Sequence, residues 1–310
     1  MTTMQRYERE YLNAFFIAPM LGVVLVFFTV MYCAVGGGRF NYDFDQNVRI
    51  MSDFVAAEKQ ADLSVVLIGN SRLRNGVNFG FDPKELLTLP DGRKMASIQY
   101  ADNGAQFASF VYLEGHILNA HPDFLVIVDS ILTNSPATDN LLVNYARIVA
   151  GYVQTIMFKT DYHKAWWEGR TEPEKNCYED FTRRMMQFRI ETTSKRDHHS
   201  LNEVDNKYIP EMRRFIDLAV KNRIKVIILN IPPNSEVLDQ FGVSADTLDF
   251  YGLGFHPAPE QLLPDTYKDV TWLNYKHPNG KEDYCDFVHF NETGRNIFSD
   301  WLKNQLSRMK

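Results

Sequence analysis

The segment that decides the fold of this chain is Leu63-Ser-Val-Val-Leu-Ile-Gly-Asn-Ser-Arg-Leu-Arg-Asn75. Within it, Val65 to Ile68 is an unbroken apolar run rich in β-branched residues, which is typical of a strand buried on both faces. The run stops at Gly69-Asn70-Ser71-Arg72, where the backbone must turn sharply and leaves a hydroxyl at the carboxyl end of the strand. Open α/β sheets bind their ligands at that edge, and a helix beginning there directs N–H groups toward developing negative charge.

Apolar runs alternate with amphipathic segments along much of the chain. Further strands are predicted at residues 97–100, 124–128 and 225–231, and helices at 45–58, 105–119, 208–221 and 291–309. Because each strand is a continuous apolar run, the sheet should be parallel and covered by helices on both faces. The sequence therefore predicts a three-layer α/β/α sandwich with a mainly parallel sheet. Between about residues 135 and 206 the alternation fails, which indicates a largely helical insertion.

Composition places the chain among ordinary globular proteins, with 45% hydrophobic and 23% charged residues. The formal net charge of −6 gives no reason to expect nucleic acid, which requires a basic face, so we expect no nucleic-acid partner. The cysteines are Cys33, Cys177 and Cys285, and no two have the C-x-x-C spacing of a zinc site. A bond between Cys177 and Cys285 in an exported domain and two free thiols both remain open.

A long apolar segment runs from Leu12 to Val35, and its 24 residues carry no charge. As a helix it would be about 36 Å long, against roughly 30 Å of bilayer hydrocarbon. A buried core helix would be amphipathic or shorter. A cleaved signal peptide is the other alternative, and Ala34-Val35-Gly36 loosely resembles a cleavage site, but signal cores span only about 7–15 residues. The segment therefore predicts one N-terminal transmembrane helix.

Flanking charges predict the orientation of this anchor. Arg6, Arg9 and the amino terminus precede the span, whereas Arg39 alone follows closely, which favours a cytoplasmic N-terminus. We expect a single-pass protein of the cytoplasmic (inner) membrane whose catalytic domain is periplasmic or extracellular. The predicted parts are a cytoplasmic N-terminus (1–10), the anchor (11–36), a lead-in helix and linker (37–61), and the exported domain (62–310) with its insertion at about 135–206.

The insertion contains residues that could bind ligands. Trp166 and Trp167 could stack on a sugar ring or lie at the membrane surface, or they could simply pack the insertion against the sheet. His163, His198 and His199 have no carboxylate or cysteine at ligand spacing, so a solvated loop is expected there rather than a metal site.

A second polar motif near the end of the chain supplies a base for Ser71. Asp286 and His289 are three residues apart, so on one helical turn they would share a face just before the last helix. The carboxylate could accept the histidine Nδ1–H and leave Nε2 to take a proton from Ser71. The alternatives are an accidental Asp-x-x-His pair on the surface, and a structural Ser71 that caps the following helix.

These two motifs resemble the first and last blocks of SGNH (GDSL-like) hydrolases. The likeness rests on Gly69-Asn-Ser71 and on Asp286-Phe-Val-His289-Phe-Asn-Glu-Thr-Gly294, and it covers about residues 62–134 and 207–310. It implies an SGNH or flavodoxin-like fold with Ser71 as nucleophile, His289 as general base and Asp286 as the carboxylate that orients it.

The resemblance also implies an oxyanion hole formed by Ser71, Gly104 and Asn134. Gly104 matches the glycine that the family has after its second strand. The segment 126–134 lacks the usual Gly-x-Asn-Asp, and Asn134 falls about two residues late. Asn70 and Arg72, with Trp166 and Trp167, are weaker candidates for substrate contact.

The overall plan of an N-terminal anchor and an exported SGNH domain is similar to DltD-like proteins and to anchored acetyltransferases of exopolysaccharide systems. The resemblance implies O-acyl transfer to a glycan or polyol of the cell envelope through an acyl-Ser71 intermediate, without a cofactor. An esterase acting on carbohydrate or lipid is one alternative. A non-catalytic subunit that holds a multispanning membrane O-acyltransferase is the other, although such a scaffold has no need of an intact Ser71, Asp286 and His289.

Overall fold

The computed structural model describes residues 44–102, 107, 110–133, 209–232, 234, 236, 263–276, 280–285 and 288–309. The chain divides into two units, Met1–Tyr42 with Asn140–Ala150 and Asp43–Asp139 with Gly151–Lys310, and every described residue belongs to the second. The predicted anchor and the predicted insertion lie outside the described residues. Within the described part, no helix has the length and apolar character needed to cross a membrane.

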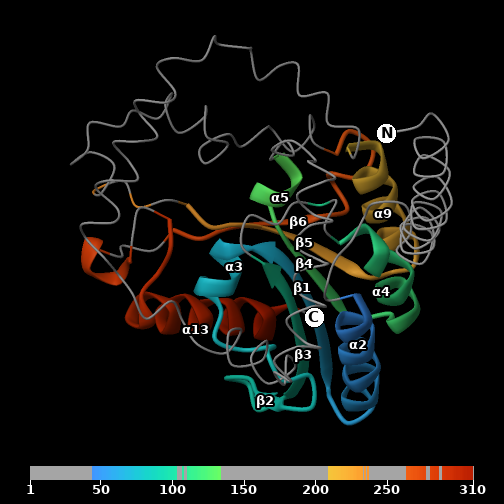
Figure 1. Cartoon of the computed structure of the whole chain (residues 1–310), viewed down its shortest axis with the longest axis horizontal. Helices are drawn as coiled ribbons and strands as arrows, with labels where there is room; N and C mark the ends of the chain where they lie inside the picture. Colours follow the sequence, from blue (N-terminus) through green and yellow to red (C-terminus); the bar gives the residue numbers. More distant parts are fainter. Residues whose placement is uncertain are drawn as a thin grey trace, which may run out of the picture. The chain divides into compact units, whose positions relative to one another are not determined.

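Six strands form one sheet in the order β2-β3-β1-β4-β5-β6 (Figure 1). Their bounds are β1 (Leu63–Asn70), β2 (Leu86–Thr88), β3 (Lys94–Asp102), β4 (Phe124–Val128), β5 (Lys225–Asn230) and β6 (Thr271–Asn274). All neighbouring pairs are parallel except β2 with β3, so the predicted mainly parallel sheet is confirmed.

The strand order reverses between β1 and β4. From β1 the next parallel strand along the chain, β3, lies on one side, while β4, β5 and β6 follow in sequence on the other side. Such a reversal is the topological switch point at which doubly wound sheets bind ligands, outside the carboxyl ends of the strands. Ser71 directly follows β1 and Ser130 nearly follows β4, so both residues lie at this point.

Helices cover both faces of the sheet and make the three layers (Figure 1). One core, which includes Val66, Ile127 and Ile228, is closed by α2 (Phe44–Glu58), α4 (Glu114–Ala120) and α9 (Ile209–Lys221). The other core, which includes Val65, Val126 and Leu229, is closed by α3 (Ser71–Gly76) and α13 (Glu292–Arg308). Adjacent residues of one strand alternate between these cores because successive side chains of a strand point to opposite faces.

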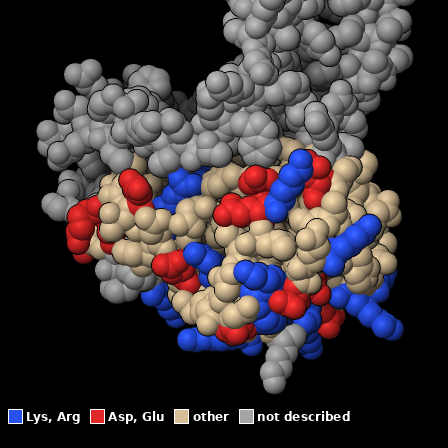
Figure 2. Space-filling model, turned by 90° about the horizontal axis from the view of Figure 1, so that it is seen from below, with Lys and Arg blue, Asp and Glu red and all other residues tan. Residues whose placement is uncertain are grey.

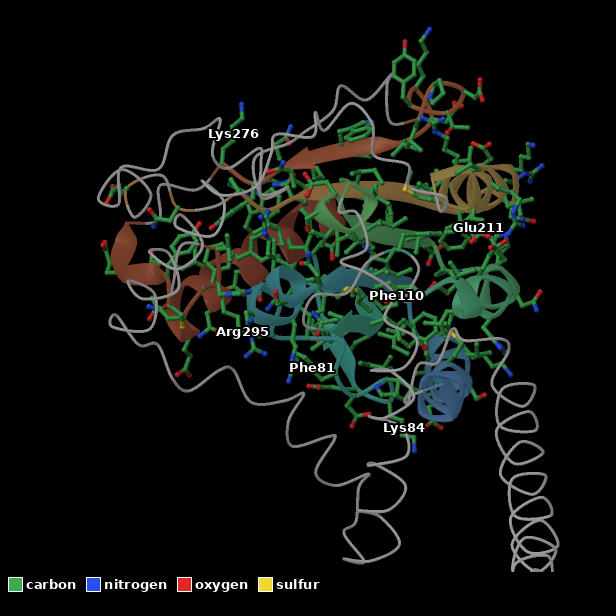
Figure 3. All side chains as sticks on the ribbon, turned by 45° about the horizontal axis from the view of Figure 1, so that its top comes forward. Phe81, Lys84, Phe110, Glu211, Lys276 and Arg295 are labelled. Carbon is green, nitrogen blue, oxygen red and sulfur yellow. The ribbon has the colours of Figure 1, made fainter. Side chains whose placement is uncertain are left out.

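Polar contacts fasten α13 to the segment that follows α3. Ser299 Oγ donates to the carbonyl oxygen of Gly76 (3.2 Å) and accepts from the Asn78 N–H (2.9 Å). Arg295, only 6% exposed, donates from Nε to the carbonyl oxygen of Val77 (3.2 Å). Its guanidinium also lies 5.2 Å from the ring centre of Phe81 (Figure 3). Burial lowers the pKa of Arg295 from its ordinary value.

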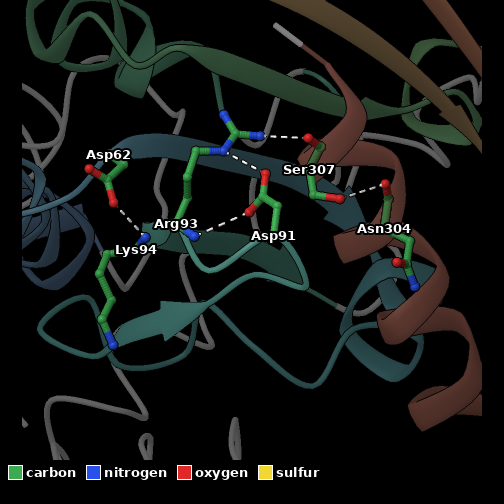
Figure 4. Close-up of polar contacts among 6 residues, drawn as sticks. All are labelled: Asp62, Asp91, Arg93, Lys94, Asn304 and Ser307. Atoms are coloured by element: carbon green, nitrogen blue, oxygen red, sulfur yellow. Dashed lines mark hydrogen bonds and ion pairs between the residues drawn. The ribbon is translucent and has the colours of Figure 1, made fainter.

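The far end of α13 is held by a loop of the sheet. Arg93 Nη2 donates to the carbonyl oxygen of Ser307 (2.6 Å), while its Nε donates to Asp91 (2.7 Å) (Figure 4). A cation near the last turn of a helix satisfies carbonyl groups that have no partner within the helix. Helix α13 is therefore tied to the end of α3 through Arg295 and Ser299, and to a loop of the sheet at its last turn.

Charges of both signs are mixed on the outer surface of this unit. In the view of Figure 2, Lys and Arg side chains lie among Asp and Glu side chains across the described part of the face. On this face the described residues form no continuous basic surface of the kind that nucleic acid requires.

Gly69 permits the close packing of α3 on the end of β1. A Cβ at Gly69 would lie 2.5 Å from Leu73 Cβ and 2.9 Å from Val128 Cγ2. Among the described glycines only Gly80 and Gly92 have positive φ. Gly69 is therefore required because a side chain would overlap its neighbours, and not because its backbone conformation is unusual. The sequence indicated a tight turn here, and the structure attributes it to the approach of Leu73.

Several predicted boundaries differ from the observed ones. The second strand, predicted at 97–100, spans Lys94–Asp102. In the described part of the predicted helix at 105–119, the α-helix is Glu114–Ala120, and the 3₁₀ helix η2 (Val111–Leu113) precedes it. The short edge strands β2 and β6 and the short helices α5 (Ser130–Thr133) and η4 (Lys281–Asp283) were not predicted.

Two glycine-to-alanine substitutions separate the effect of steric overlap at Gly69 from the effect of helix propensity. Gly69→Ala should lower the free energy of unfolding by about 1–3 kcal/mol, because its Cβ overlaps Leu73 and Val128. Gly115→Ala is the control, since a Cβ in α4 meets nothing within 4 Å, and it should raise stability by about 0.5–1 kcal/mol. Urea unfolding of the full chain measures both. Equal stability of the two variants would contradict the packing described at the end of β1.

Candidate active site

A serine and a histidine from distant parts of the chain are in hydrogen-bond contact. Ser71 Oγ lies 2.8 Å from His289 Nε2, and both residues are partly exposed. The distance is that of a nucleophile and its general base. The predicted pairing of Ser71 with His289 is thus present in the structure.

Ser71 does not cap the helix that it begins. Asn70 is the N-cap residue of α3, and its Oδ1 accepts a hydrogen bond from the Arg72 N–H (3.1 Å). The structural alternative for Ser71, that of a helix cap, is therefore wrong: the neighbouring asparagine satisfies the helix terminus. Because Asn70 caps the helix, the Ser71 hydroxyl can make its hydrogen bond with His289.

His289 is carried by a tight hairpin that precedes α13. The Cys285 N–H donates to the His289 carbonyl oxygen (2.7 Å), and Tyr284 and Phe290 form an antiparallel bridge. A helical turn was expected at this position, but His289 lies in a non-helical segment whose backbone hydrogen bonds run across a hairpin. Asp286 lies outside the described residues, so its orienting role stays a prediction.

The aromatic ring of Phe290 fixes the residue next to His289. It packs edge-on against Tyr275 (centroids 5.9 Å apart), at a tilt against Tyr284 (4.6 Å) and stacked on Phe298 of α13 (5.5 Å). Aromatic pairs at these separations add to the stabilisation that comes from burial alone. The backbone that bears the imidazole is consequently anchored in the core.

Asn291 and Gly294 have structural roles that explain the rest of the last motif. Asn291 is the N-cap of α13: its Oδ1 accepts from the Gly294 N–H (3.0 Å), and its Nδ2 donates to the Glu282 carbonyl oxygen. A Cβ at Gly294 would overlap the carbonyl oxygen of Asp283 and lie 2.9 Å from the Phe290 ring. The hydrogen bonds of Asn291 and the absence of a side chain at Gly294 therefore allow the hairpin to pack closely against the start of α13.

Arg72 and Tyr284 bring charge and a phenol near this hairpin. Arg72 is 3% exposed and donates from Nη1 to the carbonyl oxygen of Ile231 (3.1 Å), just beyond β5. Burial, aided by the negative charge of Asp283 and opposed by Arg72, raises the pKa of Tyr284 to about 12. Tyr284 is thus protonated and neutral at neutral pH.

Most of the remaining predicted site residues lie outside the described residues: Gly104, Asn134, Trp166 and Trp167. The oxyanion hole and the stacking role of the tryptophans stay predictions. Asn70 and Arg72 are described, and both side chains are buried with partners inside the protein.

Sequence reasoning missed Ser130, which accepts a hydrogen bond from Asn70 Nδ2 (2.8 Å). Its position two residues after the apolar run 124–128 was the one available signal.

Cys285 is disulfide-bonded. The other cysteines, Cys33 and Cys177, lie outside the described residues. Among the residues that the structure describes, no group of His, Cys, Asp and Glu side chains could hold a metal ion.

Comparisons with known proteins give limited similarity. No family model matches the sequence, and no curated protein matches it. A solved GDSL-like lipase from Bacteroides thetaiotaomicron has 14% sequence identity and a TM-score of 0.39, with 86% of this chain and 98% of that chain covered. A lipase/acylhydrolase from Enterococcus faecalis has 12% identity and a TM-score of 0.37, with 80% and 97% covered. At such scores the function has to be argued from the residues of this chain.

Ser71→Ala should separate chemistry from stability. The variant loses one hydrogen bond, to His289, which is worth about 0.5–1.5 kcal/mol, so it should fold and melt within a few degrees of wild type. It should also form no covalent adduct with a serine-directed fluorophosphonate, because the attacking oxygen is gone. Adduct formation is read by mass spectrometry of the full chain. An adduct of normal yield on Ser71→Ala would remove Ser71 as the nucleophile.

Asp286→Asn tests the carboxylate that the sequence assigns to His289. If Asp286 fixes the histidine tautomer, the change should lower ester turnover by about 10⁴-fold, as it does in serine proteases. Asp283→Asn, on the same hairpin, is the control, since only the backbone of Asp283 bonds to Asn291, and it should keep near-normal turnover. Similar turnover for both variants would exclude Asp286 from the site.

Proposed function

We propose that this chain is a membrane-anchored serine acyl-transfer enzyme of the SGNH type that O-acylates a glycan or polyol of the cell envelope. One observation carries the proposal: the contact of 2.8 Å between Ser71 Oγ and His289 Nε2 at the switch point of a mainly parallel sheet. The motifs around both residues, Gly69-Asn-Ser71 and Asp286-x-x-His289, agree with this chemistry.

In the first half-reaction Ser71 Oγ attacks the acyl carbonyl of a donor ester while His289 Nε2 takes the hydroxyl proton. The tetrahedral intermediate collapses, the bond to the donor alkoxide breaks, and His289 returns the proton to that leaving group. An acyl-Ser71 ester and a free alcohol are the products. The N–H of Ser71, with Gly104 and Asn134, is the proposed set of donors to the oxyanion.

In the second half-reaction an acceptor hydroxyl takes the acyl group from Ser71. His289 removes the acceptor proton as the oxygen attacks, the bond to Ser71 Oγ breaks, and the proton passes to Ser71. A sugar hydroxyl as acceptor makes the enzyme an O-acyltransferase, and water makes it an esterase. The two differ in whether the site excludes water and binds the alcohol. No step of this cycle needs a metal or a cofactor.

Export of the domain is supported by the state of Cys285. Its disulfide fits an oxidising compartment outside the cytoplasm, because cytosolic thiols are kept reduced. The apolar segment from Leu12 to Val35, preceded by Arg6 and Arg9, supplies the proposed anchor with its N-terminus inside. A membrane-bound acyltransferase that feeds acyl groups to this domain is the proposed partner.

The reaction class is tested with the full chain purified in detergent. A chromogenic acetyl ester is supplied with and without a soluble glycan oligosaccharide, and acetate and acetylated sugar are quantified. Transfer predicts acetylated sugar at the expense of acetate, whereas an esterase releases acetate alone. If neither product forms and no fluorophosphonate adduct appears, while Ser71→Ala still restores polymer O-acylation in a deletion strain, the chain is an accessory subunit.

The disulfide gives a separate prediction about location. Cys285→Ser should lower the free energy of unfolding of the exported chain by about 2–5 kcal/mol, because the bond restricts the unfolded chain. Cys177→Ser should match it if these two residues pair, and Cys33→Ser should then have no effect. Denaturant unfolding with and without a reductant measures the difference. Wild-type protein that unfolds identically in both conditions would remove this support for export.

A further inference from the structure

The carboxyl ends of β1 and β4 are joined by a side-chain hydrogen bond. Asn70 Nδ2 donates to Ser130 Oγ (2.8 Å), and the two residues are 6% and 3% exposed. The bond crosses between the two neighbouring strands where the sheet order reverses, immediately beside Ser71. A hydrogen bond between two buried polar groups is costly to break, because losing one partner leaves the other buried and unsatisfied.

Asn70 uses both ends of its amide at once. Its Oδ1 caps α3 by accepting from the Arg72 N–H (3.1 Å), and its Nδ2 reaches Ser130. The amide therefore cannot rotate without breaking one of these bonds. Because Ser71 lies between Asn70 and Arg72, the cap and the link to Ser130 together fix the backbone that carries the nucleophile.

The chain is tied on the other side of Ser71 as well. Arg72 crosses toward the end of β5, where its Nη1 donates to the carbonyl oxygen of Ile231 (3.1 Å). The residues before and after the nucleophile thus point inward and bind the ends of two neighbouring strands, whereas Ser71 itself stays partly exposed.

We propose that Ser130 is a positioning residue for the nucleophile: through Asn70 it holds the Ser71 hydroxyl in line with His289. This assignment rests on the proposed acyl-transfer function. Ser130 acts through Asn70 rather than on substrate, because it is buried and accepts its hydrogen bond from the asparagine. A nucleophile that shifts by a fraction of its hydrogen-bond distance from the base attacks less often, even when substrate binds normally.

The opposite ends of the same two strands offer a matched control. Ser64 is the second residue of β1 and is 2% exposed. Its Oγ donates to Oδ2 of Asp123 (3.0 Å), the residue that precedes β4. Its Oγ also accepts from the Asp123 N–H (2.9 Å). Ser64→Ala therefore removes a buried serine that links β1 to the β4 side, but at the end of the sheet away from Ser71.

The test compares Ser130→Ala with Ser64→Ala in the full chain in detergent. p-Nitrophenyl acetate gives kcat and KM, a fluorophosphonate gives the rate of Ser71 labelling, and thermal melting gives stability. Ser130→Ala should lower kcat and the labelling rate by about 10–10²-fold while KM changes less than about twofold. Ser64→Ala should melt at a reduced temperature with kcat near that of wild type.

A second variant guards against a merely structural effect. Asn70→Ser keeps an N-cap oxygen for α3 but is too short to reach Ser130, so it should reproduce the kcat loss of Ser130→Ala. Because both changes break one bond, the double variant should be no slower than either single variant.

If Ser130→Ala is labelled at the wild-type rate and its kcat is unchanged, the positioning role is overturned and the proposed function stays intact. A kcat loss that Ser64→Ala shares would also overturn it, because the effect would then follow stability. Wild-type protein that neither labels at Ser71 nor hydrolyses the ester would overturn the proposed function and this assignment together.

Discussion

The packing of α13 against the end of α3 is the constraint on which the site depends. A short helix leaves carbonyl groups without partners at its end, and here Ser299 and Arg295 of α13 supply donors to Gly76 and Val77. The same contact buries the apolar face of α13 on the sheet, so polar satisfaction and hydrophobic burial favour one position of the helix. His289 precedes α13 and Ser71 begins α3, which makes their contact of 2.8 Å a consequence of how the two helices pack.

Sheet topology determines which polar residues lie beside the contact between Ser71 and His289. Parallel strands deliver their carboxyl ends to one edge, and the reversal of strand order sets the end of β1 beside that of β4. Polar groups that are buried there are tolerated only with partners. Asn70 with Ser130, and Asn230 with Asp129 (2.7 Å), meet this requirement by bonding across strand ends. These bonds connect the carboxyl ends of β1, β4 and β5 to one another beside Ser71.

The sequence predicted the centre of the fold better than its rim. β1, β4 and β5 are buried on both faces, so each is a continuous apolar run with recognisable ends. The edge strands β2 and β6 are short and partly exposed, and nothing in Leu86–Thr88 or Thr271–Asn274 separates them from loops. For the site, the two motifs and their resemblance to SGNH blocks were enough to pair Ser71 with His289. They could not give the hairpin geometry, because that depends on how the Phe290 ring packs against Tyr275 and Phe298, which motif spacing does not specify.

The two ends of β1 show why the remaining site residues escaped prediction. Ser64 and Asn70 are both buried and both link β1 to the β4 side through hydrogen bonds, and neither partner, Asp123 or Ser130, is near in sequence. A pattern of residue types cannot distinguish a link that holds strand register from one that orients a nucleophile, because the chemistry of the bond is the same. The difference lies in what the bond leaves exposed. At the start of β1 the hydrogen-bonded serine is itself buried, whereas at the end the bonded asparagine is buried and the adjacent Ser71 reaches solvent and His289. Function at this site is therefore a property of position at the sheet edge, which only the folded arrangement of the strands determines.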